Sequence, residues 1–241
     1  MIKIVFLILS ASFLINAQSK NTIVVGTGFY PPFTFINEIG ELDGFEIELG
    51  NEISKKLGKP FIWKQLPFKE LFQSLEKGNI DLIIGAIHIT EERQKKYLYS
   101  IPYTNTGLVF IISKKNRDEF YNTEDFKGKR IAAKAKSTGY DYLDVNRVNY
   151  NFLINEFPET EDCFKALERG EVDAVVSDYL SSRLYLKAKD SFAIATAPFN
   201  LTGIGIVSTK NNIKLMKEIN EVIQSLNLNS YIKNLYIKWL L

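Results

Sequence analysis

Few residues of this chain could do chemistry, and one of them is an arginine in an unusual place. Residues 90–93, Thr-Glu-Glu-Arg, have the pattern of a helix start, with Thr90 as the N-cap. A cation in the first turn of a helix opposes the helix dipole. Arg93 is therefore either a surface side chain paired with a neighbour, or a side chain that turns back to grip a carboxylate with two parallel donors.

Asp178 and Thr138 stand at two other segment ends. Asp178 stands just beyond the strand predicted at residues 172–176, and it can hold an ammonium group or cap a helix that starts at Tyr179. Residues 137–139, Ser-Thr-Gly, precede another helix, and their donors can hold an anion or simply cap that helix. A free amino acid needs a cation with donors for its carboxylate, an anion for its ammonium group, and walls that exclude water. The sequence offers all of these.

Four further side chains could complete such a site. Tyr30 lies in a stiff aromatic turn and Phe68 opens a helix, so their rings could wall a ligand, although aromatic residues are more often core. Lys134 adds a positive charge at a strand end, or is simply solvated there. His88, two residues before Thr90, is the only histidine, and a lone histidine is more often structural.

Composition excludes several other classes of function. The 241 residues are 46% hydrophobic and 24% charged, which predicts a globular α/β protein large enough for two modest cores. The net charge of +2 comes from interspersed Lys, Arg, Asp and Glu, so we expect no nucleic-acid partner. One His and one Cys, Cys163, exclude a nitrogen-and-sulfur zinc site and an internal disulfide. We expect no metal, no cofactor and no catalytic residues.

The N-terminus has the parts of a secretory signal. Lys3 is followed by an apolar run at residues 4–15, too short to span a bilayer comfortably, and then by Ala17 and a polar segment. We expect residues 1–17 to be a signal peptide that is cleaved after Ala17, which places the protein in the periplasm. An uncleaved anchor is the alternative.

An internal repeat indicates how the chain is organised. Residues 71–86 echo residues 163–178, and each copy reads as a helix that ends at a glycine, Gly78 or Gly170, before a buried strand. Upstream of the first copy, a further helix is predicted to stop at Gly58. With the segments upstream of each copy, the order strand, helix, strand, helix, strand occurs twice. This order predicts two parallel-sheet α/β lobes.

Two lobes imply a cleft between them. Ligands of open α/β sheets gather at the carboxyl ends of the strands, where the candidate residues above are placed. Residues 100–106 and 197–203 read as two strands that cross between the lobes. We therefore expect lobe 1 to comprise residues 22–102 and 203–241, and lobe 2 to comprise residues 108–197.

Taken together, these segments resemble the bacterial extracellular solute-binding proteins of family 3, the periplasmic polar amino-acid-binding proteins of ABC transporters. The resemblance covers nearly all of the chain after the leader. It rests on Leu143 with the Ser-Thr-Gly before it and on YPPFTF at 30–35, GELDGFEIEL at 40–49, IHITEER at 87–93, VDAVVSD at 172–178 and SYIKNLYIKW at 230–239. It implies the type II periplasmic-binding-protein fold, with two lobes joined by a two-strand hinge.

The resemblance also implies roles for individual residues. Arg93 would bind the ligand carboxylate, helped by Thr138 and by backbone groups near Gly85 and Ala86. Asp178 would bind the ammonium group, and Tyr30 and Phe68 would wall the ligand. The implied partners are an amino acid and the permease of an ABC transporter, with the binding protein itself a monomer.

Two departures from the family pattern bear on the ligand. Many relatives have an acidic residue just after the first strand, where this chain has Thr-Gly at residues 27–28, and relatives usually have Ser or Thr in place of His88. With Lys134 and His88 present and that acid missing, we expect a small polar or acidic amino acid, glutamate-like or glutamine-like. His88 either donates to the ligand or alters which ligand fits.

One alternative is an enzyme on the same scaffold. Some proteins of this kind are periplasmic cyclohexadienyl dehydratases, which act on arogenate or prephenate. Such an enzyme needs a general acid that faces the leaving group. No cleft segment of the sequence offers an obvious spare Glu, so the non-catalytic receptor is the main prediction.

Overall fold

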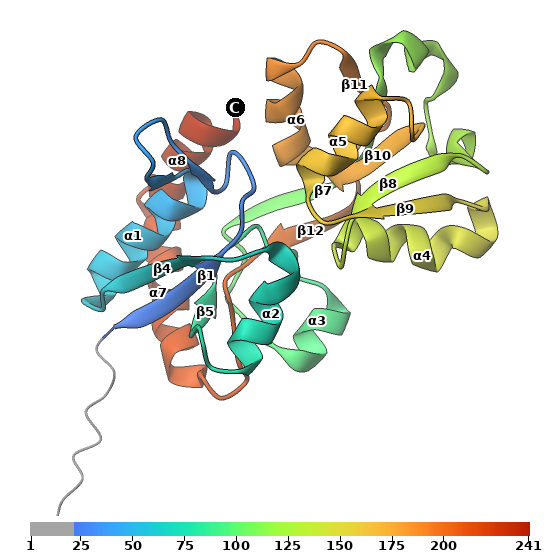
Figure 1. Cartoon of the computed structure of the whole chain (residues 1–241). Coiled ribbons are helices and arrows are strands. Elements are labelled where there is room, and N and C mark those ends of the chain that lie inside the picture. Colours follow the sequence, from blue (N-terminus) through green and yellow to red (C-terminus); the bar gives the residue numbers. More distant parts are fainter. Residues whose placement is uncertain (1–21) are drawn as a thin grey trace, which may run out of the picture.

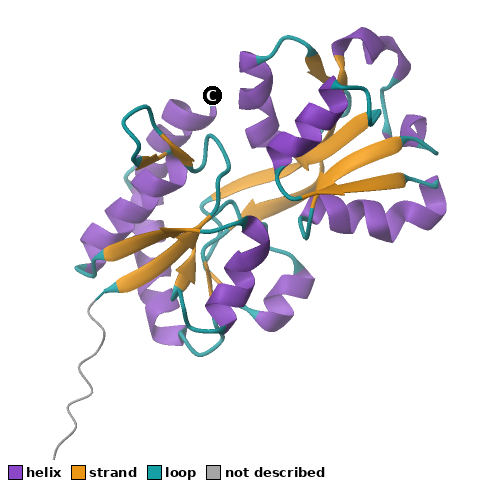
Figure 2. Cartoon of the chain, viewed as in Figure 1, coloured by secondary structure: helices purple, strands orange, loops and turns teal. Residues whose placement is uncertain are grey.

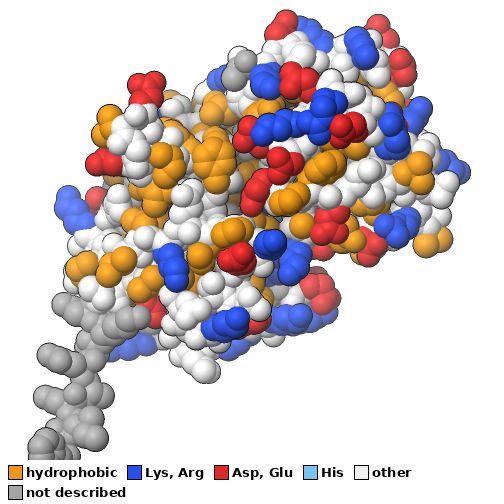
Figure 3. Space-filling view, in the orientation of Figure 1, with side chains coloured by type: hydrophobic (Ala, Val, Ile, Leu, Met, Phe, Trp, Pro, Cys, Tyr) orange, Lys and Arg blue, Asp and Glu red, His pale blue; other side chains and the backbone are white. Residues whose placement is uncertain are grey.

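The computed structural model describes residues 22–241, which fold around two β-sheets with helices on both faces of each (Figures 1 and 2). The predicted signal peptide lies outside the described residues. No helix within residues 22–241 is long and apolar enough to cross a membrane. Charges of both signs are interspersed over the visible face (Figure 3).

The first sheet has the strand order β4-β1-β5-β13-β6. Its strands are β1 (Ile23–Thr27), β4 (Phe61–Gln65), β5 (Leu82–Ile83), β6 (Leu98–Tyr99) and β13 (Val207–Ser208). Its helices are α1 (Phe45–Leu57), α2 (Phe68–Glu76), α3 (Glu91–Lys96), α7 (Ile213–Leu228) and α8 (Tyr231–Leu240), and a small ribbon pairs β2 (Phe35–Ile36) with β3 (Leu42–Asp43).

The second sheet has the order β11-β7-β10-β8-β9, with β12 paired to β7. Its strands are β7 (Thr104–Ser113), β8 (Arg130–Lys134), β9 (Leu153–Phe157), β10 (Ala174–Asp178), β11 (Phe192–Ile194) and β12 (Phe199–Ile204). Its helices are α4 (Thr138–Tyr150), α5 (Thr160–Glu168) and α6 (Tyr179–Ala188), with 3-10 turns at Lys114–Glu119 and Thr123–Phe126.

The repeat in the sequence is a repeat in the fold. In the first sheet β1 runs parallel to β4 and β5, and in the second β8 runs parallel to β9 and β10. Helices α2 and α5 are each followed by a left-handed glycine, Gly78 with φ 70° and Gly170 with φ 69°. Each copy buries its apolar stripe against its own sheet, Leu71 and Leu75 in one and Phe164 and Leu167 in the other. The prediction of two lobes is confirmed.

Both sheets also contain antiparallel strands, which the repeat did not predict. In the first sheet β13 runs antiparallel to β5 and β6, and in the second β7 runs antiparallel to β10, β11 and β12. These strands lie in the segments that enter and leave the second sheet, outside either copy of the repeat, so the repeat carries no information about their direction.

A pair of strands joins the two sheets. β7 and β12 run antiparallel between them, with Thr104 opposite Ile204 and Thr106 opposite Thr202 (Figure 1). The predicted two-strand hinge is therefore present, although its strands begin at Thr104 and Phe199, later than the predicted residues 100 and 197. The residue limits predicted for the two lobes stay a proposal.

The first sheet and the C-terminal helices share one core. Phe45, Leu49 and Ile53 form the buried stripe of α1, and they pack in the same cluster as Ile219 and Ile223 of α7. Helix α1 ends where the sequence predicted, because Gly58 adopts the left-handed conformation with φ 63° and its N–H bonds the carbonyl of Lys55.

The end of α1 gives a stability prediction. A Cβ at Gly58 would meet no atom within 4 Å, so Gly58→Ala changes only the backbone preference. We expect a loss of about 1 kcal/mol in the free energy of unfolding in urea, because a non-glycine residue is strained at positive φ. Gly58→Asn is the matched control and should lose less, since Asn tolerates this conformation better. Equal stabilities of all three proteins would contradict the assignment.

Candidate functional site

Side chains from both sheets line one cavity beyond the carboxyl ends of the parallel strands. The cavity brings together every site residue that the sequence nominated: Tyr30, Phe68, Gly85, Ala86, His88, Arg93, Lys134, Thr138 and Asp178. Seven further residues complete the lining: Leu108, Ser137, Gly139, Thr160, Cys163, Val176 and Ser177. The arrangement follows the general rule that strand ends of open α/β sheets carry the ligand site.

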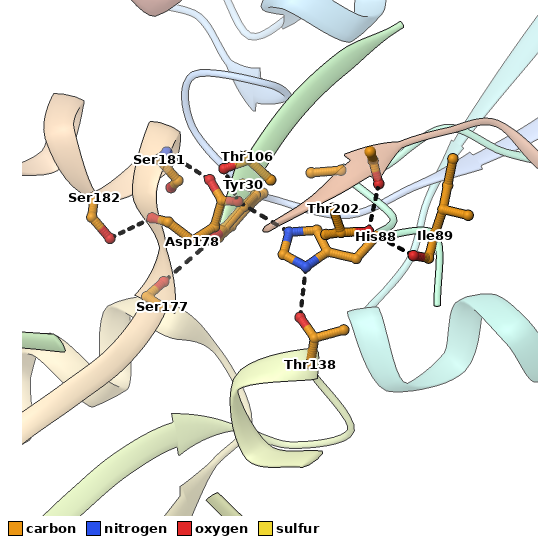
Figure 4. Close-up of polar contacts among 12 residues, drawn as sticks. Tyr30, His88, Ile89, Thr106, Thr138, Ser177, Asp178, Ser181, Ser182 and Thr202 are labelled. Carbon is orange, nitrogen blue, oxygen red and sulfur yellow. Dashed lines mark hydrogen bonds and ion pairs between the residues drawn. The ribbon is translucent and has the colours of Figure 1, made fainter. Parts of the chain in front are cut away.

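Asp178 is the best-held charged group in the cavity. It is 4% exposed and is the N-cap of α6, where its Oδ1 accepts a bond of 3.0 Å from the N–H of Ser181. Its Oδ2 accepts a bond of 2.6 Å from the hydroxyl of Thr106 and lies 3.0 Å from Nε2 of His88 (Figure 4). Asp178 is therefore the helix cap that the sequence offered, and it also lines the cavity. Its role toward an ammonium group stays a prediction.

His88 lies between the two sheets and touches the second through its ring. Its Nε2 faces Asp178, and its Nδ1 lies 2.8 Å from the hydroxyl of Thr138, the first residue of α4 (Figure 4). Because a carboxylate only accepts, Nε2 carries the proton, and in the neutral ring Nδ1 accepts from Thr138. His88 is 5% exposed, and its backbone forms a bridge with Ile204 of the hinge.

Arg93 reaches across the cleft from the first turn of α3. Its backbone N–H bonds the hydroxyl of Thr90, which is the predicted N-cap. Its guanidinium donates to the carbonyl of Lys136 at 3.1 Å and to that of His88 at 3.4 Å, and it packs over the ring of Phe72. Within residues 22–241 it forms no ion pair with a carboxylate, so its charge is available to the cavity.

Lys134 places a second cation in the cavity, inside an aromatic box. Its Nζ lies 4.0 Å from the centre of the Phe68 ring and 4.6 Å from that of Tyr30. Burial lowers the pKa of Lys134 to about 8, partly offset by the charge of Glu159. Among the described residues no hydrogen bond or ion pair reaches this ammonium group.

Tyr30 supports the box from the first lobe. Its ring stacks on Phe33, and its hydroxyl lies 3.3 Å from the hydroxyl of Ser177 at the end of β10. Burial raises the pKa of Tyr30, and the charge of Asp178 raises it further, so the phenol stays protonated. The ring can therefore wall a ligand while its hydroxyl bonds the opposite sheet.

Glu46 lies behind the strand ends and was missed as a functional candidate. It is fully buried in the first turn of α1, where it accepts bonds from the N–H of Ala86 at 2.7 Å, from the hydroxyl of Thr34 at 3.3 Å and from the hydroxyl of Tyr103. Burial raises its pKa to about 7. Glu46 thereby fixes Ala86, a lining residue with the unusual φ of 52°.

Comparison with known proteins places the chain in a family. The sequence model for bacterial extracellular solute-binding proteins, family 3, matches residues 23–241. The chain belongs to this family. The resemblance noted in the sequence is thus confirmed, and the family description fits a protein that acts outside the cytoplasm. The L-cystine-binding protein TcyJ of Escherichia coli (strain K12) is 29% identical to it over 227 residues, covering 93% of this chain and 84% of TcyJ.

Solved structures resemble this family 3 solute-binding protein along nearly its whole length. An ancestral arginine-binding protein bound to arginine matches with a TM-score of 0.86 and 32% identity, covering 91% of this chain and 98% of that one. An ancestral arginine-binding protein bound to glutamine gives 0.84 and 32%, with coverages of 91% and 97%. These likenesses confirm the two-lobed periplasmic-binding-protein fold.

Some lining residues of this solute-binding protein could have been found from its repeat. Phe68 and Thr160 occupy equivalent positions at the starts of α2 and α5, and Gly85 and Ser177 are equivalent after the repeated strands. Both members of each pair line the cavity. Thr106 had no such signal, because it lies in the hinge outside both copies.

Glu46 predicts how stability depends on pH. A carboxyl whose pKa is about 7 in the folded state, above its ordinary value, binds its proton more tightly when folded, so stability falls as pH rises from about 4.5 through 7. We expect this one group to lower the free energy of unfolding by about 3 kcal/mol over that range.

The measurement is urea unfolding at several pH values of the natural protein and of Glu46→Gln, whose amide does not titrate. As pH rises, the free energy of unfolding of the natural protein should fall more than that of Glu46→Gln. A difference independent of pH would contradict the raised pKa.

Proposed function

We propose that this protein is a periplasmic receptor that captures a small polar or acidic amino acid, glutamate-like or glutamine-like, and delivers it to an ABC transporter. The observation that carries the proposal is the set of charges in one cavity: Arg93 and Lys134 as cations and Asp178 as the anion. The cavity lies between two lobes, which suits a receptor that closes around its ligand.

The main chain of an amino acid fits two of these charges, those of Arg93 and Asp178. Its carboxylate would bind the guanidinium of Arg93, the hydroxyl of Thr138 and the N-terminus of α4, and its ammonium group would bind Asp178. These groups come from α3, α4 and β10, so a ligand that uses all of them contacts both lobes at once. Ligand binding would then stabilise the closed arrangement that a transporter recognises.

Lys134 sets the preferred side chain of the ligand. With Arg93 and Asp178 matched to the main chain, the ammonium group of Lys134 remains for the ligand side chain. A side-chain carboxylate would complement its charge, whereas a neutral side-chain amide would bind without depending on it. A cationic side chain would meet this ammonium group inside the aromatic box of Tyr30 and Phe68. The relatives bind ligands of several charges, but this chain has no acidic residue at positions 27–28 to offset Lys134.

The dehydratase alternative finds less support in the cavity. Asp178 is the one carboxyl group among the described lining residues, and it is held by three donors. Glu46, the buried carboxyl with a raised pKa, bonds the backbone of Ala86 behind the lining. A general acid would have to face the substrate, so we favour a receptor without catalysis.

Calorimetric titration with single amino acids tests this function. The panel is L-glutamate, L-glutamine, L-aspartate, L-cystine and L-arginine, each added to purified protein from which bound amino acids have been removed. We expect the tightest binding for glutamate or glutamine and loss of binding in Arg93→Ala and Asp178→Ala. Absence of heat with every amino acid, together with turnover of arogenate or prephenate, would replace the receptor with the enzyme.

Lys134 gives a sharper prediction about the ligand side chain. Lys134→Gln should weaken glutamate about tenfold or more, because a charge-assisted contact is lost, and should leave glutamine nearly unchanged. Lys136→Gln is the matched control, an exposed lysine two residues away, and should change neither affinity. Equal losses for glutamate and glutamine in Lys134→Gln would contradict the role.

The same lysine predicts the pH dependence of binding. As pH rises through about 8, Lys134 loses its proton, so the affinity for glutamate should fall while that for glutamine stays level. Glutamine is the internal control, because it shares the α-ammonium and α-carboxylate groups of glutamate. Parallel profiles for the two ligands would argue against a contact between Lys134 and a side-chain carboxylate.

A further inference from the structure

The side chain of His88 occupies both main-chain subsites of the cavity. Its ring joins Asp178 to Thr138 across the cleft, and these are the groups that the proposed function assigns to the ammonium and the carboxylate of the ligand (Figure 4). All three side chains are at least nine-tenths buried, so water does not compete for these bonds. The contact therefore opposes a ligand that needs the same groups.

The position of His88 at Asp178 makes the two occupants compete. A carboxylate offers about four acceptor positions. Ser181 lies in α6, directly after Asp178, and Thr106 lies in β7, the strand paired with β10, so both hold their positions regardless of how the lobes lie. His88 is the donor that comes from the other side of the cleft, and its Nε2 lies 3.0 Å from Oδ2, where a ligand nitrogen would lie.

Thr138 is engaged in the same way. With Nε2 of His88 protonated toward Asp178, Nδ1 accepts the hydroxyl proton of Thr138, which then cannot point at a ligand carboxylate. One rotation of the His88 side chain would free Asp178 and Thr138 together. Both ends of the ligand main chain thus depend on the position of one ring.

We propose that His88 determines the affinity and the specificity of the site. Its ring holds the lobes together and competes with the ligand, because an α-amino acid must displace it from Asp178. This inference rests on the proposed function, because it concerns how an amino acid gains the ammonium subsite. A competing internal contact lowers the apparent affinity for a ligand, because only the molecules with a free site can bind it. It also favours ligands that do not bind Asp178, since His88 can then keep its bond.

Small-angle X-ray scattering and calorimetry of His88→Ser test the proposal. Scattering from the protein without added amino acid should give a larger radius of gyration for the variant, because the bond across the cleft is gone. Glutamate should bind the variant about tenfold more tightly, in line with the loss of one hydrogen bond to a charged group. Glutarate, which has both carboxylates and no ammonium group, should gain less, because it benefits from the release of Thr138 but not from that of Asp178. The preference for glutamate should therefore widen.

Two further variants separate competition from simple loosening. Ser181→Ala removes a different bond across the cleft, that of its hydroxyl to the carbonyl of Pro31 at 2.9 Å, and leaves the backbone cap of Asp178 in place. It should not raise the affinity for glutamate. His88→Gln keeps a donor that can reach Asp178, and should restore the smaller radius of gyration and the natural affinity.

The outcomes distinguish this inference from the proposed function. Glutamate binding that weakens or stays unchanged in His88→Ser would overturn the competition and leave the receptor function standing, as would an equal gain in Ser181→Ala. Failure of every amino acid to bind either protein would overturn both, and a larger radius of gyration in His88→Ser would then show that the contact across the cleft exists without this function.

Discussion

A buried carboxylate must be surrounded by donors, and Asp178 is where this requirement shapes the molecule. It ends the central strand of one lobe, caps α6 through Ser181, accepts the hydroxyl of Thr106 from the hinge strand, and meets His88 from the other side of the cleft. An uncompensated charge at 4% exposure would be strongly destabilising, so these elements are fixed relative to one another. The same donors determine what a ligand can reach.

The surroundings of Asp178 come from two lobes that contain the same repeated helix and strand. Each copy of the repeated helix and strand ends in the cavity, but the first copy ends at Ala86 and the second at Asp178. The first lobe contributes Arg93 and the aromatic rings, and the second contributes the anion and Lys134. A polar cavity with opposite charges therefore arises from one scaffold used twice, with different residues at equivalent ends.

Much of this was predictable from sequence because it depends on local rules. The repeat, the glycines Gly58, Gly78 and Gly170 that terminate helices, and the position of ligand sites at strand ends together brought nine lining residues to one place. The antiparallel strands and the bond from Thr106 to Asp178 depend on how the chain returns through the hinge, which no local pattern encodes. Glu46 was missed because acidic residues are common in the first turn of a helix, where the helix dipole favours them. Its sequence position therefore gives no sign of a role in the site.

A crystal structure of the protein with L-glutamate would test directly whether Asp178 binds the ammonium group of the ligand. We expect the α-carboxylate on Arg93, the ammonium nitrogen within hydrogen-bonding distance of Asp178, the side-chain carboxylate beside Lys134, and the ring of His88 turned away from Asp178. Glutamate bound outside this cavity, or bound within it with its ammonium group away from Asp178, would show that this carboxylate is not the ligand-binding group.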